Sequence, residues 1–178
     1  MGYEPLIIVI GLGNPLRGDD GIGWYAVDRI AESIKNPKIE FLKYRELLPE
    51  ISEKVSKAKY VLFIDAAVGG SKAQVEEKGV APAETYPSFD THQLDPGGLL
   101  AFSKAVYGKA PDAIIMTADG ESFQYHDELS VGARAGVQLL VNRACEILGI
   151  WLKSRRESCA DSECQLINYL NGPHPMPA

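Results

Sequence analysis

The sequence is poor in the residues that build covalent or metal-clamped scaffolds. Its 178 residues include only three cysteines and three histidines, and no two cysteines have a CxxC spacing. Cys145, Cys159 and Cys164 are odd in number and lie late in the chain, which supports neither a disulfide framework nor a zinc knuckle. We therefore expect reduced thiols and a fold that depends on its apolar core.

Signals for export and for membrane insertion are also missing. The segment from Met1 to Leu6 leads into a short apolar stretch without a basic flank or a small-residue cleavage site. No uninterrupted apolar run approaches the roughly 20 residues that a membrane-spanning helix needs. These observations predict a cytoplasmic protein without a membrane partner.

Positive charge is in the minority. The chain has 18 Lys and Arg against 24 Asp and Glu, a formal net charge of −6. Polyanion binding needs clustered Lys and Arg, so we expect no nucleic acid partner. Apolar residues make up 46% and charged residues 24%, as in ordinary globular domains, so neither general disorder nor a fibrous repeat is indicated.

The length fits one compact domain with a full core. No repeat or linker interrupts the chain before Trp151, so we predict a single domain over residues 1–152, and we expect a monomer. Residues 153–178 become polar and then proline-rich, without a core-forming period, and predict a mobile or loosely docked tail.

Hydrophobic patterns alternate along the chain between those of strands and those of helices. Short β-branched runs predict buried strands, and apolar residues at helical spacing predict helices. The predicted strands are residues 6–10, 39–43, 60–64, 73–80 and 113–117, and the predicted helices are residues 21–35, 49–57, 94–107 and 128–151. This alternation predicts a three-layer α/β/α sandwich around a mostly parallel, twisted sheet of about five strands, phosphorylase/hydrolase-like in architecture.

Polar residues gather where the predicted strands end. Asp19 and Asp20 follow the first strand, Asp65 ends a central strand, and His92 lies in a loop before a helix. Ligands of open α/β sheets bind outside the carboxyl ends of the strands, so these segments can reach one edge. Two carboxylates and an imidazole suit a borderline metal such as nickel or zinc and leave a coordination position open.

Each of these residues also has a purely structural interpretation. Asp20 can cap a helix, Asp65 can accept hydrogen bonds from loop amides, and His92 can bond to the backbone. His126, in a polar loop before the last helix, either supports the site from behind or is exposed.

The segment from Gly11 to Gly18 offers a different interpretation, as a phosphate-binding loop at a helix N-terminus. It departs from GxGxxG because Leu16 takes the place of the third glycine. In addition, Asp19 and Asp20 would repel an anion. A dinucleotide site is therefore disfavoured.

Three blocks carry a family resemblance: Gly11-Leu-Gly-Asn-Pro-Leu-Arg-Gly-Asp-Asp-Gly-Ile-Gly23, Ile64-Asp-Ala66 and Asp90-Thr-His-Gln-Leu94. A fourth, Glu121-Ser-Phe123 followed by Leu129-Ser130, precedes the last predicted helix. On these blocks the chain resembles the hydrogenase maturation endopeptidases, which trim the C-terminal extension of the large subunit of nickel-iron hydrogenases. The resemblance covers residues 6–148.

The resemblance implies the site and the partner. Asp20, Asp65 and His92 correspond to the family's metal-contacting positions and would be both catalytic and metal-binding, in a protease of aspartyl type. The family recognises nickel already inserted in the precursor of the large subunit, so the metal belongs to the substrate and no tightly bound cofactor is expected. No Ser-His-Asp, Cys-His or HExxH arrangement is evident, so we expect water attack helped by that metal and one carboxylate.

The segment Arg45-Glu-Leu-Leu-Pro-Glu50 departs from the family's Asp-Gly-Gly-Thr and resembles the version in proteases of soluble bidirectional hydrogenases. The identity of the partner hydrogenase therefore stays open. One alternative is a non-catalytic nickel-sensing assembly chaperone with the same ligands. Another is a peptidyl-tRNA hydrolase, a family that shares Gly-Leu-Gly-Asn-Pro but continues with Arg-His-Asn, which is absent here.

Overall fold

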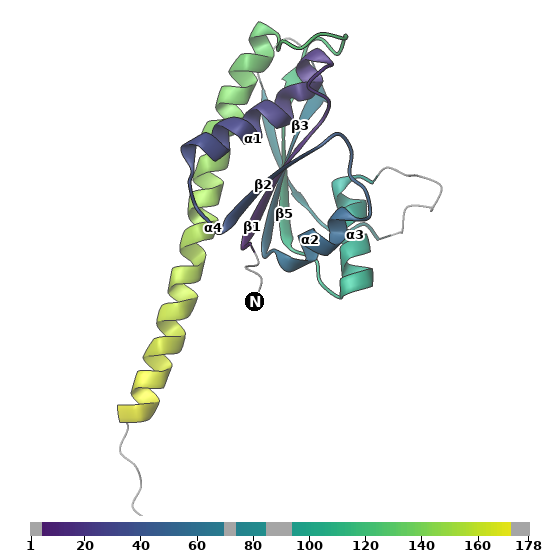
Figure 1. Cartoon of the computed structure of the whole chain (residues 1–178). Helices are drawn as coiled ribbons and strands as arrows, with labels where there is room; N and C mark the ends of the chain where they lie inside the picture. The colour runs from purple at the N-terminus through teal and green to yellow at the C-terminus, as the bar shows by residue number, and fades with distance from the viewer. Residues whose placement is uncertain (1–4, 70–73, 85–93, 172–178) are drawn as a thin grey trace, which may run out of the picture. The chain divides into compact units, whose positions relative to one another are not determined.

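The computed structural model describes residues 5–69, 74–84 and 94–171, with side chains described as far as Ser154. The chain divides into two compact units, Met1–Cys145 and Glu146–Ala178. The division falls inside the last helix. The first unit holds the sheet and the sites described below (Figure 1).

A five-stranded sheet lies at the centre of the first unit, in the order β2-β1-β3-β5-β4. β1 pairs in parallel with β2 and β3, and β3 pairs in parallel with β5, whereas β4 is an antiparallel edge strand on β5. The bounds are β1 (Ile7–Leu12), β2 (Ile39–Tyr44), β3 (Tyr60–Val68), β4 (Val75–Val80) and β5 (Asp112–Gly120). The predicted mostly parallel α/β sheet is confirmed.

Helices cover both faces of this sheet (Figure 1). α1 and the part of α4 up to Cys145 lie on one face, and α2 and α3 lie on the other. The bounds are η1 (Gly18–Gly21), α1 (Ile22–Ser33), α2 (Ile51–Lys57), α3 (Pro96–Tyr107) and α4 (Val131–Asn171). All six residues of β1 are buried, as expected for a strand covered on both sides.

Alternate residues of β1 serve the two layers. Ile8 and Ile10 belong to the core cluster that also contains Ile51 of α2 and Leu99 of α3. The intervening side chains point to the opposite face, where α1 buries its own apolar residues. Full burial of each large apolar side chain stabilises the fold by roughly 1.5–3 kcal/mol, so this core dominates stability.

Several predicted element ends were wrong, and β5, for example, ends at Gly120 instead of residue 117. β3 does not stop at Asp65 but continues to Val68, because β5 is long enough to pair with it as far as Gly120. α4 does not end at Trp151 but continues to Asn171, since the sequence has no glycine or proline between Trp151 and Gly172. Residues 172–178 lie outside the described residues.

Residues 131–154 of α4 form a segment that is long and apolar enough to cross a membrane, by length and composition only. The sequence pattern predicted no such segment. Length and composition alone are weak evidence, because a core helix meets the same criterion. Ala133, Val137 and Leu140 of this helix are at most 2% exposed, as in a core helix.

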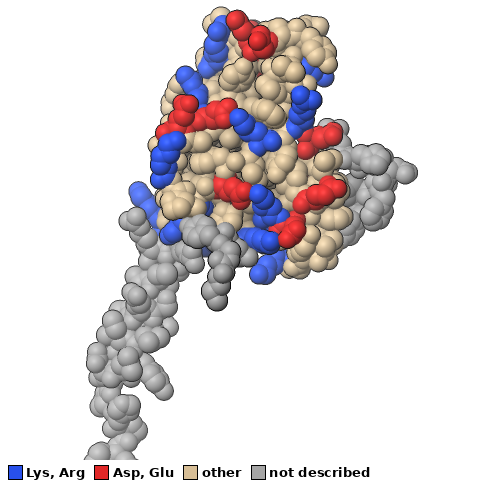
Figure 2. Space-filling view, in the orientation of Figure 1, with Lys and Arg blue, Asp and Glu red and all other residues tan. Residues whose placement is uncertain are grey.

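Acidic and basic side chains are interspersed over the face of the molecule that Figure 2 shows. Several of them form ion pairs, such as Lys43 with Asp28 at 2.7 Å and Lys54 with Glu40 at 2.6 Å. Exposed pairs of this kind contribute about 0–1 kcal/mol each. The surface ion pairs therefore add little to the stability that the core provides.

Candidate active site

The loop after β1 is tightly folded around glycine. Gly13 has a φ of 109°, and a Cβ placed on it would lie 1.8 Å from the backbone oxygen of Asp20. Only glycine meets both the conformational and the steric requirement. The close approach of Gly13 to Asp20 sets the path of the chain that carries the Asp20 carboxylate.

Gly13→Ala is expected to destabilise the fold by more than the roughly 1–2 kcal/mol that a positive φ alone costs, because a backbone clash is added. Thermal melts of purified variants would measure the loss. Gly108→Ala is the matched control, since Gly108 has a φ of 71° but nothing within 4 Å of an added Cβ. Equal melting temperatures for the two variants would contradict the expectation.

The Asp20 side chain bonds to this loop and does not cap a helix. Its Oδ2 accepts a hydrogen bond from the backbone N–H of Asn14 at 2.9 Å. The N-cap of α1 is Gly21, and no side chain caps that helix. The capping interpretation of Asp20 was therefore wrong, and the half-buried carboxylate is left facing a hollow that Asp65 also lines.

Asp65 lies within β3, opposite Thr117 of β5, and its carboxylate accepts a bond from the N–H of Ala66 at 2.8 Å. Burial raises the pKa of Asp65 to about 6, the bond from Ala66 opposes that rise, and the negative charge of Asp20 adds to it. The two carboxylates are therefore electrostatically coupled. A cation placed near them would relieve both the burial penalty and the repulsion.

Asp20 and Asp65 share one hollow of about 650 Å³. It lies at the carboxyl ends of β1 and β3, where the order β2-β1-β3 shows that the chain reverses its direction across the sheet. Ligands of open α/β sheets bind at this kind of switch point. The hollow is lined by Leu12, Gly13, Asn14, Arg17, Asp20, Arg45, Glu46, Leu47, Asp65, Leu94, Asp95 and Pro96.

The third predicted ligand, His92, lies outside the described residues. Within the parts of the chain that are described, no group of three or more His, Cys, Asp or Glu side chains is arranged to hold a metal ion. The structure thus brings together Asp20 and Asp65 of the predicted set.

Asp19 has a role that the sequence analysis did not identify. It is fully buried, and its carboxylate accepts three backbone hydrogen bonds: from Glu121 at 2.7 Å, from Ser122 at 3.0 Å and from Ser130 at 2.7 Å. Burial acts to raise the pKa of Asp19, but these amides outweigh it, so the pKa is lowered. Asp19 fastens the loop that carries Asp20 to the segment 121–130.

His126 also connects the loop after β1 to the segment 121–130. Its backbone oxygen accepts a bond from the N–H of Gly18 at 2.7 Å, and its Nδ1 accepts one from the N–H of Glu128 at 3.1 Å. The imidazole is exposed and does not line the hollow. His126 therefore supports the neighbouring loop and is not a ligand candidate.

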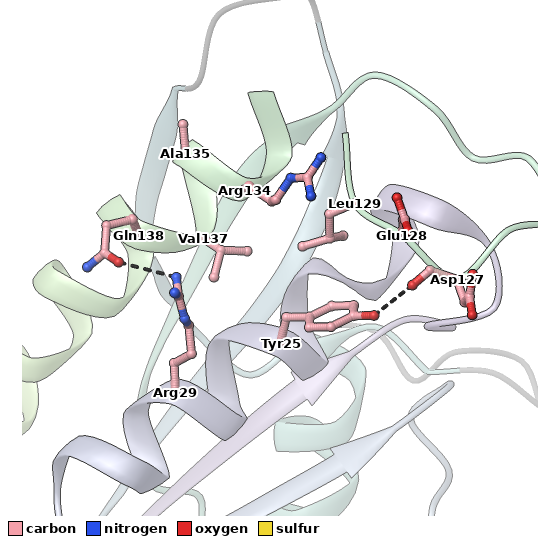
Figure 3. Close-up of a pocket in the computed structure, with 9 residues that line it drawn as sticks. All are labelled: Tyr25, Arg29, Asp127, Glu128, Leu129, Arg134, Ala135, Val137 and Gln138. Atoms are coloured by element: carbon pink, nitrogen blue, oxygen red, sulfur yellow. Dashed lines mark hydrogen bonds between the residues drawn. The ribbon is translucent and has the colours of Figure 1, made fainter. Parts of the chain in front are cut away.

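A second hollow, of about 600 Å³, lies between α1 and the start of α4 (Figure 3). Tyr25 donates a hydrogen bond from its hydroxyl to the backbone oxygen of Asp127 at 2.8 Å, and Arg29 donates one to Gln138 at 3.2 Å. The acidic side chains in its lining are exposed and lie in no coupled pair of the kind that Asp20 and Asp65 form. The coupled carboxylates, and with them the chemistry, belong to the hollow at the sheet edge.

Comparisons with known proteins point in the same direction. No family model matches the chain. A Methanocaldococcus jannaschii protein, provisionally assigned as a hydrogenase maturation protease, is 25% identical over 148 residues, which cover 80% of this chain and 93% of that protein.

Solved structures with the same fold include the [NiFe] hydrogenase maturation protease HycI from Thermococcus kodakarensis KOD1, with a TM-score of 0.64 and 26% identity over 83% of this chain and 94% of that one. The hydrogenase maturating endopeptidase HybD from E. coli has a TM-score of 0.60 and 21% identity over 85% of this chain and 93% of that one. The resemblance that the sequence blocks carry is therefore confirmed: the chain is similar in sequence and in fold to the [NiFe] hydrogenase maturation proteases.

Proposed function

We propose that this chain is a peptidase that removes the C-terminal extension of a nickel-iron hydrogenase large-subunit precursor, acting in the cytoplasm as a monomer. One observation carries the proposal. Asp20 and Asp65, which come from separate blocks of the sequence resemblance, share one hollow at the switch point of a sheet similar to those of maturation proteases.

We further propose that Asp20, Asp65 and His92 contact the nickel that the precursor already holds, so that metal insertion permits cleavage. The raised pKa of Asp65 supports this role, because no positive charge among the described residues compensates the pair, and a metal ion would supply one. His92 precedes Leu94, which lines the hollow, by two residues. Carboxylate and imidazole ligands suit nickel.

Asp65 is the better placed of the two carboxylates to accept a proton from the attacking water. Burial raises its pKa to about 6 in the nickel-free protein, and nickel bound beside it would lower that pKa and keep the carboxylate ionised, as a proton acceptor must be. Its backbone bond to Ala66 occupies only Oδ1 and leaves the second oxygen for the water. The substrate's nickel, when bound, would polarise the scissile carbonyl or acidify that water.

The test is incubation of the purified protein with nickel-loaded and nickel-free precursor, followed by intact mass measurement. We expect loss of a C-terminal peptide from the loaded form alone. Cleavage of both forms would contradict nickel recognition but would still support the peptidase activity. If no candidate precursor loses mass, the assembly-chaperone alternative takes its place.

A further inference from the structure

Two arginines line the hollow, and neither has a side-chain partner in the part of the chain that the structure describes. Arg17 lies in the loop after β1 and Arg45 directly follows β2, and both are exposed. Among the described residues neither guanidinium has a hydrogen-bond or ion-pair partner. By contrast, Arg29 donates to Gln138 and Arg143 pairs with Glu77.

These arginines do not pair with the two carboxylates of the hollow. Asp20 accepts a hydrogen bond from the N–H of Asn14, and Asp65 accepts one from the N–H of Ala66. Among the described residues, neither carboxylate forms an ion pair with Arg17 or Arg45. Both guanidinium groups therefore remain available to an anion.

Other acidic groups in the lining do not engage the arginines either. Asp95 accepts a hydrogen bond from the N–H of Gly98 at 2.6 Å as the N-cap of α3. Glu46 follows Arg45 in the chain and is exposed, and it forms no ion pair with Arg17 or Arg45. The hollow thus presents carboxylates and unpaired guanidinium groups to one ligand.

We propose that Arg17 and Arg45 bind a carboxylate of the precursor's C-terminal extension, a specificity contact that rests on the proposed function. Guanidinium groups match the planar geometry of a carboxylate and form charge-assisted hydrogen bonds with it. A precursor would then be held at two points of the hollow. Asp20 and Asp65 would contact its metal ion, and the two arginines would bind a carboxylate further along its chain. The carboxylate comes from an acidic side chain or from the C-terminus of the extension.

The first test is steady-state cleavage of nickel-loaded precursor by Arg17→Ala and Arg45→Ala. Each is expected to raise KM by about tenfold with little change in kcat, because the contact is made equally in the ground and transition states. Arg45→Lys should recover part of the loss. Arg134→Ala is the matched control, since Arg134 also lacks a partner among the described side chains but lines the other hollow.

The second test measures binding of a synthetic extension peptide by fluorescence anisotropy and does not depend on cleavage. Wild-type protein should bind the peptide, more weakly as salt increases, and both arginine variants should lose about tenfold in affinity. Amidating the peptide C-terminus, or changing its Asp and Glu to Asn and Gln, shows which carboxylate is bound. The correct change should weaken wild type and leave the arginine variants unaffected.

The outcomes separate this inference from the function on which it rests. Peptide binding that depends on the arginines, without cleavage of the precursor, would support the contact and overturn the peptidase. The contact would be overturned if both arginine variants cleaved the precursor with an unchanged KM, or if both bound the peptide with the affinity of wild type. The proposed peptidase activity would not be affected by either result.

Discussion

Asp19→Ala is expected to lower the free energy of unfolding by roughly 3–5 kcal/mol, because a buried acceptor is removed from three amides at once. The amides of Glu121, Ser122 and Ser130 would each lose the charged partner that they now have. Urea denaturation followed by circular dichroism would measure the change. The loss is expected to be larger than that caused by any single exposed ion pair.

Matched variants separate the loss of the carboxylate from the loss of its bulk. Asp19→Asn keeps the shape and one acceptor oxygen, so its stability should fall between those of wild type and Asp19→Ala. Asp95→Ala removes one capping bond and should cost only about 1 kcal/mol. If Asp19→Ala lowered the free energy of unfolding no more than Asp95→Ala does, Asp19 would not stabilise the contact between its loop and the segment 121–130 as its hydrogen bonds indicate.

The effect of Asp19 depends on pH in a direction that its pKa determines. The folded pKa lies below the usual value of 3.8, so the carboxylate stabilises the native state above that pH. Its contribution is lost as pH falls through the folded value. The difference between wild type and Asp19→Ala should therefore shrink in strong acid.

The sequence predicted the strands that share a continuous apolar core, since runs such as Ile7–Leu12 are buried at every position. It did not predict the ends of β3 and α4. The length of β3 depends on its pairing with β5, which no local pattern of residues 60–68 reveals. The extension of α4 depends on the absence of breakers in a stretch without an apolar face.

The candidate site was also predicted only in part from the sequence. Asp20 and Asp65 were predicted to meet because the carboxyl ends of parallel strands share an edge, and they do line one hollow. Asp19 was missed because its partners lie 102 to 111 residues away in the sequence. The block Glu121-Ser-Phe123 with Leu129-Ser130 was the available signal, since it contains all three partners.

Asp65→Asn is expected to change stability and activity in opposite directions. The asparagine removes the proton acceptor, so cleavage of nickel-loaded precursor should fall by about 10²–10⁴-fold. It also removes a carboxylate that is buried beside another, while its amide oxygen can still accept the bond from Ala66. The variant should therefore be more stable than wild type at neutral pH, by roughly 1–2 kcal/mol after allowance for solvent screening.

The pH dependence of that stability gain follows from the raised pKa of Asp65. Between the unfolded value near 3.8 and the folded value of about 6, the native state binds more protons than the unfolded state, so stability falls as pH rises. The advantage of Asp65→Asn should therefore be absent near pH 4, grow through pH 6 and level off above it. Urea denaturation across this range would measure it, with Asp112→Asn, at an exposed position of β5, as the matched variant. Asp20→Asn should give a smaller gain, because it relieves the repulsion but not the burial. An Asp65→Asn variant that cleaves normally, or whose stability gain is the same at pH 4 and pH 8, would refute the role assigned to this carboxylate.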